Sequence, residues 1–228
     1  MEDLCVRLTD MPDEILLLIL NKLTNIEVLY SLIGINIRLD KIVNDPIFTE
    51  HLTLMRRSSN GVINLLDDSI LKRFYSEILP KIHYKIKWFD LEPLCMERIL
   101  LAADYPNLHG LSLFNIERET ILRLFDGSTS DIINIVCTYV LIMCTNLLCL
   151  KFHPYSDIYV DFRERLSFES IEPARFFSSN LMELQINVDD FTDCLYLLDG
   201  RFPRLCIFYV DVRLFTPPSP AIINKIDY

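Results

Sequence analysis

A short pattern that recurs four times constrains the fold of this chain more than any other feature of its sequence. Each copy reads leucine, two variable residues, leucine or phenylalanine, one variable residue and a final apolar residue. The copies begin at Leu108, Leu147, Leu181 and Leu205. In the second half of each copy, apolar and variable residues alternate. This two-residue period is typical of a β-strand with one buried face. Looser copies at 51–54 and 85–88 raise the number of expected strands to six.

Helical patterns fill the gaps between these strands. They lie at 69–79, 96–103, 120–125, 131–144 and 193–198. Strands that alternate with helices favour a parallel sheet in which helices form the connections. We therefore expect an α/β fold. An ordinary α/β sandwich that contains a chance repeat is the alternative to a true repeat structure.

The repeated unit resembles a leucine-rich repeat. Its expected central positions, 52, 86, 111, 150, 184 and 208, are 24 to 39 residues apart, whereas regular repeats of this kind span about 20–29 residues. The resemblance implies an irregular solenoid with a curved parallel sheet over residues 49–215. A Pro-rich tail at 216–228 would follow it.

The first 48 residues read as a separate domain of three short helices. Pro12 suits the first turn of the first helix, and Asn36 can cap the third. Thr24 and Glu27 fit a capping box that opens the second. The first helix is apolar at every position from 15 to 20, so it must be buried on more than one side. Either the rest of the chain or a partner must cover it.

This helical segment resembles an F-box over residues 8–47. The matching residues are Leu8, Pro12-Asp13-Glu14-Ile15, Ile19-Leu20, Leu23, Val28-Leu29, Leu32, Ile35 and Arg38-Leu39. Met11 and the Glu27-Val28 pair depart from the family pattern. So does the 35–39 segment, which lacks the usual aromatic residue.

The resemblance implies that the helices dock on a Skp-family adaptor, and through it on the cullin of a ubiquitin ligase, while the repeats hold a protein substrate. The expected adaptor contacts are Pro12, Ile15, Ile19, Leu20, Leu23 and Leu32. Ligase chemistry would then reside in other subunits, so we expect no catalytic residue and no cofactor in this chain. The alternative is a non-catalytic repeat scaffold whose F-box has decayed.

Composition argues against several other functions. A net charge of -10 opposes nucleic-acid binding, and only 5 glycines are present, with no Gly-rich phosphate motif. No Ser/His/Asp or Cys/His catalytic set can be assembled from spacing. The 7 cysteines lie mostly among apolar neighbours without CxxC spacing, which indicates thiols in a reducing compartment, the cytoplasm and/or nucleus. No histidine pairs with a cysteine at zinc-ligand spacing, so we expect no metal site.

One segment has the composition of a membrane span. Residues 132–150 carry no charge and approach the length that a bilayer requires. Thr145 and Asn146 interrupt the segment, and a buried helix, a turn and a buried strand explain it equally well. We therefore expect a buried core segment, with membrane association as a third and weaker reading of function.

Outward strand residues are the candidates for substrate contact. If Leu111 and Leu113 face the core, their neighbours face out, and the same offset applies to the other strands. The candidates are Lys85, Lys87, Ser112, Phe114, Lys151, His153, Gln185 and Tyr209. The three lysines indicate a positive end that receives an acidic or phosphorylated segment, unless they are ordinary solvated residues. Trp88 is expected in the core.

Overall fold

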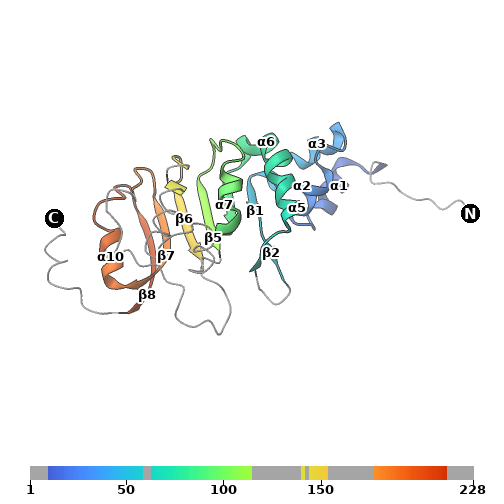
Figure 1. Cartoon of the computed structure of the whole chain (residues 1–228). Coiled ribbons are helices and arrows are strands. Elements are labelled where there is room, and N and C mark those ends of the chain that lie inside the picture. The colour runs from blue at the N-terminus through green and yellow to red at the C-terminus, as the bar shows by residue number, and fades with distance from the viewer. Residues whose placement is uncertain (1–9, 59–62, 115–139, 142–143, 154–176, 215–228) are drawn as a thin grey trace, which may run out of the picture.

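The chain folds as a mixed α/β protein built on one parallel sheet of six strands (Figure 1). The computed structural model describes residues 10–58, 63–114, 140–141, 144–153 and 177–214. The strands of the sheet follow one another in chain order, and each neighbouring pair is parallel. They are β1 (His51–Thr53), β4 (Trp88–Leu91), β5 (Gly110–Phe114), β6 (Cys149–His153), β7 (Glu183–Asp190) and β8 (Ile207–Leu214). The predicted α/β class and parallel sheet are confirmed.

A row of apolar residues runs across the middle of the sheet. In strand order it consists of Leu52, Phe89, Leu111, Leu150, Leu184 and Phe208. The first five of these side chains have no exposed surface, whereas Phe208, on the last strand, is only partly buried. The register confirms five of the six predicted central positions, and it places each of them towards the core.

The second strand departs from the prediction, because its centre is Phe89 and not Ile86. Ile86 stands three residues before the centre, where Leu108 and Leu147 stand in later copies, and it is fully buried there. A shift by an odd number of residues reverses the two faces of a strand. The prediction that Trp88 lies in the core is therefore wrong, since Trp88 lies on the opposite face from Phe89.

Helices pack against the apolar face of the sheet. α7 (Pro93–Leu100) follows β4, and α10 (Phe191–Leu197) follows β7. Both lie against the row of strands in Figure 1. Their buried side chains, among them Met96, Ile99 and Leu197, belong to the same hydrophobic cluster as the central row. This packing leaves the other face of the sheet with the variable residues of the repeated pattern.

The remaining local structure agrees with the sequence in part. The predicted helix at 69–79 is observed as part of a series of short consecutive helices. They are α5 (Asp68–Arg73), the π-helix η2 (Phe74–Ile78), α6 (Leu79–Ile82) and the 3-10 helix η3 (His83–Lys85). Asp190 and Asp193 form a capping box at the start of α10. A short antiparallel ribbon of β2 (Arg56–Arg57) and β3 (Ile63–Asn64) was not predicted.

Short helices form the N-terminal end of the molecule, beside β1 (Figure 1). They are α1 (Asp13–Leu20), α2 (Asn25–Leu32), α3 (Ile37–Val43) and α4 (Pro46–Thr49). The capping box of Thr24 and Glu27 is confirmed, and the Asn36 side chain accepts a hydrogen bond from the Leu39 amide at 2.8 Å. Gly34, with a φ of 83°, follows the end of α2, where a left-handed residue stops a helix.

The helices and the sheet share one hydrophobic core. Leu16, Leu29 and Phe48 from the helices are buried in the cluster that also contains Leu52 and Phe89. The core is therefore continuous across residue 48, where the sequence changes from helices to alternating strands and helices.

Several predicted segments lie outside the described residues. They include Leu8, the helix at 120–125, most of the helix at 131–144 and the tail at 216–228. Within the uncharged stretch 132–150, Val140 and Leu141 are helical, and Leu147 and Leu150 are buried. Among the helices that the structure describes, none combines the length and the apolar character that crossing a membrane requires.

Candidate functional site

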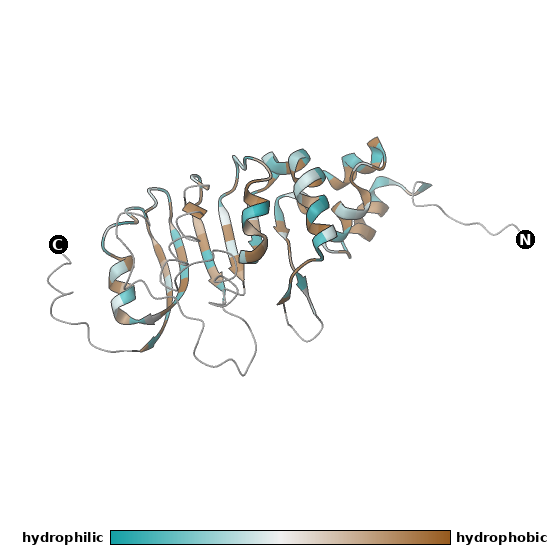
Figure 2. Ribbon diagram, in the orientation of Figure 1, coloured by the Kyte–Doolittle hydropathy of each residue, from teal (hydrophilic) through white to brown (hydrophobic). Residues whose placement is uncertain are grey.

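The first candidate site is a set of exposed apolar side chains on the N-terminal helices and on the turns between them, which we call the helical-end surface. It consists of Ile15, Leu18, Ile19, Leu23, Ile35 and Ile37, each between 41% and 80% exposed. Hydrophobic residues are prominent on the helices at this end of the molecule (Figure 2). Exposed apolar residues grouped in this way mark contact surfaces for other molecules.

The structure exposes four of the six predicted adaptor contacts. These four are Pro12, Ile15, Ile19 and Leu23. Leu32 is partly buried against the core. Leu20 is only 3% exposed, because it lies one turn after Leu16 on the face of α1 that packs inward. Leu20 therefore supports the helix from inside, which corrects the prediction that it contacts a partner.

Sequence reasoning missed three residues of the helical-end surface: Leu18, Ile35 and Ile37. The signal for Leu18 was present, since a helix that is apolar at every position from 15 to 20 cannot bury all of them against one core. Arg38 forms an ion pair with Asp13 at 2.7 Å and so ties the start of α3 to the start of α1. This contact brings the segment around residue 37 towards the first helix.

The second candidate site is the side of the sheet opposite the apolar row, which we call the open face. Its members alternate with the buried row along each strand and align across strands by register. They are His51, Thr53, Trp88, Asp90, Gly110, Ser112, Phe114, Cys149, Lys151, His153, Glu183, Gln185, Asn187, Ile207, Tyr209 and Asp211. Most of these side chains are half-buried or exposed.

Trp88 lies flat across Gly110 of the neighbouring strand. A methyl group at Gly110 would stand 1.9 Å from Cε3 of the indole, so only glycine leaves room for the ring. The indole Nε1 donates to Asp90 Oδ1 at 2.9 Å and to Ser112 Oγ at 3.2 Å. Ser112, a predicted substrate contact, is only 3% exposed, and it therefore holds Trp88 in place instead of meeting a substrate directly.

Asp90 connects Trp88 to the first strand. Its Oδ2 accepts a hydrogen bond from Thr53 Oγ1 at 2.9 Å and lies 2.9 Å from His51 Nε2. Burial alone would raise the pKa of Asp90, but the hydrogen bonds from His51, Thr53 and Trp88 outweigh it and hold the pKa below its ordinary value. Asp90 is therefore ionised at neutral pH and anchors three side chains.

Lys85 and Lys87 do not lie on the open face of a strand, because the shift of three residues places them before β4. Lys85 Nζ donates to the carbonyl and side-chain oxygens of Asn44 at 2.8 and 3.0 Å. Lys87 pairs with Glu50 at 2.6 Å. Both lysines thus connect the start of β4 to the helical end of the molecule.

Lys151 lies near Trp88. Its Nζ is 2.8 Å from Glu183 Oε1 and 5.5 Å from the centroid of the Trp88 ring. The hydrogen bond between the two charged groups raises the pKa of Lys151 and lowers that of Glu183. The structure therefore joins Lys151 to Trp88, whereas the sequence had grouped it with two lysines that lie outside the open face.

The remaining predicted substrate contacts lie on the later strands. Phe114 and His153 are neighbours in the register, and their rings are stacked with centroids 4.3 Å apart. Gln185 is half-buried and Tyr209 is 59% exposed. All four face away from the buried row, as the alternation of the strands predicted.

Asparagines connect successive turns at the edge of the sheet. Asn107, Asn146 and Asn180 each stand four residues before a strand centre. Each side-chain amide donates to a backbone carbonyl of the preceding turn, at 2.6, 3.0 and 2.9 Å respectively. The accepting carbonyls belong to Tyr84, Pro106 and Thr145. The recurrent asparagine of the sequence pattern therefore holds one turn to the next.

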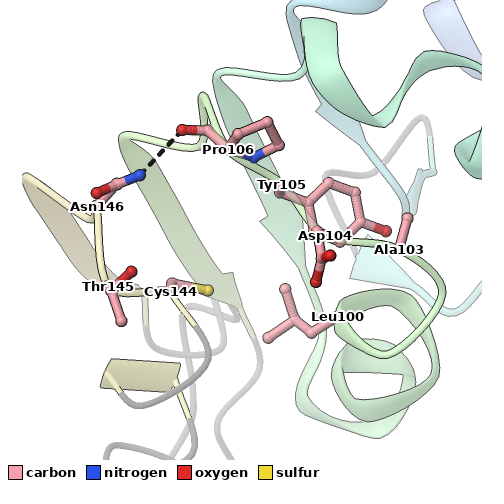
Figure 3. Close-up of a pocket in the computed structure, with 8 residues that line it drawn as sticks. All are labelled: Leu100, Ala103, Asp104, Tyr105, Pro106, Cys144, Thr145 and Asn146. Atoms are coloured by element: carbon pink, nitrogen blue, oxygen red, sulfur yellow. Dashed lines mark hydrogen bonds between the residues drawn. The ribbon is translucent and has the colours of Figure 1, made fainter.

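A pocket lies between two of these turns (Figure 3). It is lined by Leu100, Ala103, Asp104, Tyr105, Pro106, Cys144, Thr145 and Asn146. Burial raises the pKa of Tyr105, and it raises the pKa of the Cys144 thiol to about 12, so both groups stay protonated at neutral pH. Asp104 is the single carboxylate among the lining residues. The pocket therefore offers no activated nucleophile.

The rest of the described residues suit binding better than chemistry. Burial raises the pKa of Cys95 and Cys149 to about 12 and that of Cys194 to about 11, so these thiols are poor nucleophiles. Across the described residues, no group of three or more histidine, cysteine, aspartate or glutamate side chains could hold a metal ion. The Thr53 hydroxyl donates its hydrogen bond to Asp90 Oδ2, the same oxygen that contacts His51 Nε2. His51 is therefore not placed to accept the proton of the Thr53 hydroxyl and make it a nucleophile.

Comparisons with known proteins add no relative. No family model matches the chain, and a search of curated proteins finds no match. A function for this protein must therefore be inferred from its own residues and contacts.

Proposed function

We propose that this protein is the substrate-recognition adaptor of an SCF-type (Skp–cullin–F-box) ubiquitin ligase. The helical-end surface docks on a Skp-family adaptor, and the open face holds a protein substrate. Ubiquitin transfer takes place on other subunits, so this chain supplies binding surfaces and neither a catalytic residue nor a cofactor. It acts in the cytoplasm and/or the nucleus, where its thiols stay reduced.

The observation that carries this proposal is the helical-end surface. Its six apolar side chains stay exposed on α1, on α3 and in the turns after α1 and α2, whereas other apolar residues of these helices, such as Leu16 and Leu29, are fully buried. Fully burying one side chain of this kind contributes roughly 1.5–3 kcal/mol, so a few anchors offset the cost of association. The F-box resemblance of the same segment supports a Skp-family adaptor as the partner.

We further assign the helices to an F-box and the rest of the chain to an irregular leucine-rich-repeat solenoid. Ile86, Phe89 and Leu91 supply a fifth good copy of the repeated pattern once the strand is placed in its observed register. The asparagine bonds between successive turns also support a repeated unit. In such a solenoid the strand faces form an extended binding surface.

Co-purification with a recombinant Skp-family adaptor tests the proposal. The full chain should capture the adaptor, and the double variant Ile15→Asp, Ile19→Asp should bind at least about tenfold more weakly. The matched control is Leu198→Asp, which changes an apolar residue that is 53% exposed at the end of α10 and should bind like wild type. Circular dichroism should show that all three proteins are folded.

One outcome would contradict the proposal. Wild-type protein that captures no Skp-family adaptor would remove the ubiquitin-ligase function. If that protein still captured a protein substrate through the open face, the non-catalytic repeat scaffold with a decayed F-box would be the better account.

A further inference from the structure

We infer that the open face recognises its substrate through an uncharged aromatic side chain, which stacks on the indole of Trp88. The inference rests on the proposed function, because it names the chemistry of the substrate that the open face would hold. Trp88 is the single tryptophan of the chain. It lies half-buried on the polar side of the sheet, where a large apolar ring has no role in the core.

Three strands cooperate to fix the orientation of this ring. Gly110 on β5 lets the indole lie flat against the backbone, and Ser112 on the same strand accepts from Nε1. Asp90 accepts from the same Nε1 and is itself held by Thr53 on β1. A ring that is fixed before binding loses little conformational freedom when a ligand arrives. Trp88 is therefore a preorganised platform: its ring is fixed on Gly110, with the Lys151 ammonium 5.5 Å from its centroid and the tilted His51 ring 5.9 Å away.

The charges around the platform select an uncharged ligand. The Lys151 ammonium, 5.5 Å from the ring centroid, already holds the position that a cation would take over the indole. A second cation would be repelled by Lys151, and an anion would have to compete with Glu183, 2.8 Å from the same ammonium. The two oxygens of Asp90 are occupied by Trp88, Thr53 and His51. A charged ligand group would thus break an existing contact.

An aromatic side chain carries no charge with which to compete for these polar contacts. Aromatic rings pack against one another in offset-stacked or edge-to-face geometry, and a second ring beside the indole also offers its face to the Lys151 ammonium. The substrate residue that fits the Trp88 platform is therefore a phenylalanine or a tyrosine in a protein segment.

A second apolar contact is available on the last strand. Ile207 and Tyr209 face out from β8 and are 43% and 59% exposed. β8 lies four strand positions from β4, which corresponds to about 19 Å at the usual strand spacing. An extended segment covers that distance in roughly six residues. The substrate segment should therefore carry its aromatic residue and a second apolar residue about six positions apart.

Selection from a phage-displayed library of random peptides, on the full wild-type chain, tests this inference. The selected peptides should share an aligned phenylalanine or tyrosine. They should bind Trp88→Ala at least about tenfold more weakly, as expected when a central aromatic anchor is truncated. Tyr84→Ala is the matched control, because Tyr84 is an aromatic residue of η3, away from the open face, and 49% exposed. Since Trp88 is the only tryptophan, tryptophan-free peptides should also shift the fluorescence emission of the wild-type protein.

The contrary results are equally specific. Peptides that lack an aligned aromatic residue, peptides that bind Trp88→Ala as well as wild type, or a selection that enriches no peptide would each overturn the inference. Enrichment of acidic or phosphorylated residues that depend on Lys151 would replace it with recognition by charge. The Trp88→Ala variant leaves the helical-end surface unchanged, so it should still capture the Skp-family adaptor. If it does while the peptide results are contrary, the aromatic-recognition inference fails and the proposed adaptor function stands.

Discussion

The substitution Gly110→Ala should destabilise the protein when residue 88 is tryptophan and stabilise it when residue 88 is alanine. A Cβ atom at Gly110 would stand 1.9, 2.2 and 2.5 Å from three carbon atoms of the Trp88 indole, far inside van der Waals contact. The φ angle of Gly110 is not positive, so the backbone itself accepts alanine. The three atoms nearest to the added methyl group all belong to the ring of Trp88, which is therefore its main obstacle.

The expected magnitude follows from these contacts. Overpacking of a well-fitted site costs about 1–3 kcal/mol, and an indole pushed off the sheet also loses hydrogen bonds to Asp90 and Ser112 worth roughly 0.5–1.5 kcal/mol each. In a Trp88→Ala background the obstacle is gone. Gly→Ala then lowers the entropy of the unfolded chain and stabilises the protein by about 0.4–1 kcal/mol.

Urea unfolding of the four proteins in this cycle, followed by circular dichroism, measures both effects. We expect Gly110→Ala to lower the free energy of unfolding by at least about 1 kcal/mol when Trp88 is present. The same change should raise the free energy of unfolding when residue 88 is alanine. A loss of equal size in both backgrounds would show that the ring does not lie on Gly110, and the platform would have to be abandoned.

Three further predictions concern the open face and the buried row. The pKa of Asp90 lies below its ordinary value of 3.8, so its contribution to stability is complete above that value and falls as pH drops through the folded pKa. Asp90→Asn should flatten this acid dependence in urea unfolding curves. Lys151→Glu should lower the free energy of unfolding by about 1 kcal/mol, and adding Glu183→Lys should restore most of it. Leu150→Asp should abolish the circular dichroism of the fold because it buries an unpaired charge, whereas Leu148→Asp, at a position that is 36% exposed, should leave it intact.

The positions of most strands followed from the sequence because burial enforces the pattern. Leu111, Leu150 and Leu184 have no exposed surface, so any polar residue at these positions would have been costly, and the apolar period remained clear. The helix caps at Thr24 and Asn36 were equally predictable, since a cap depends on neighbours three residues away.

The position of β4 could not be chosen in the same way. Residues 85–88 alternate strictly between polar and apolar types, whereas Asp90 is the single polar residue of 88–91, and a large apolar residue such as Trp88 suits either face. The register is decided by contacts with other strands, in which Phe89 aligns with Leu52 and Leu111. The leading Ile86, three residues before Phe89, was the signal that could have separated the two choices.

The pairing of the lysines shows why the charge hypothesis could not be judged from sequence. Lys85 and Lys87 contact Asn44 and Glu50, which lie at the junction between the helices and the first strand. Reversing their charges would therefore disturb that junction, and a loss of substrate capture would report on folding as much as on recognition. Lys151 contacts Glu183 within the open face, so the exchange of those two charges preserves the pair while it moves the positive group. A substrate that depends on the position of positive charge must respond to this exchange, whereas a substrate held by the Trp88 platform must respond chiefly to loss of the ring.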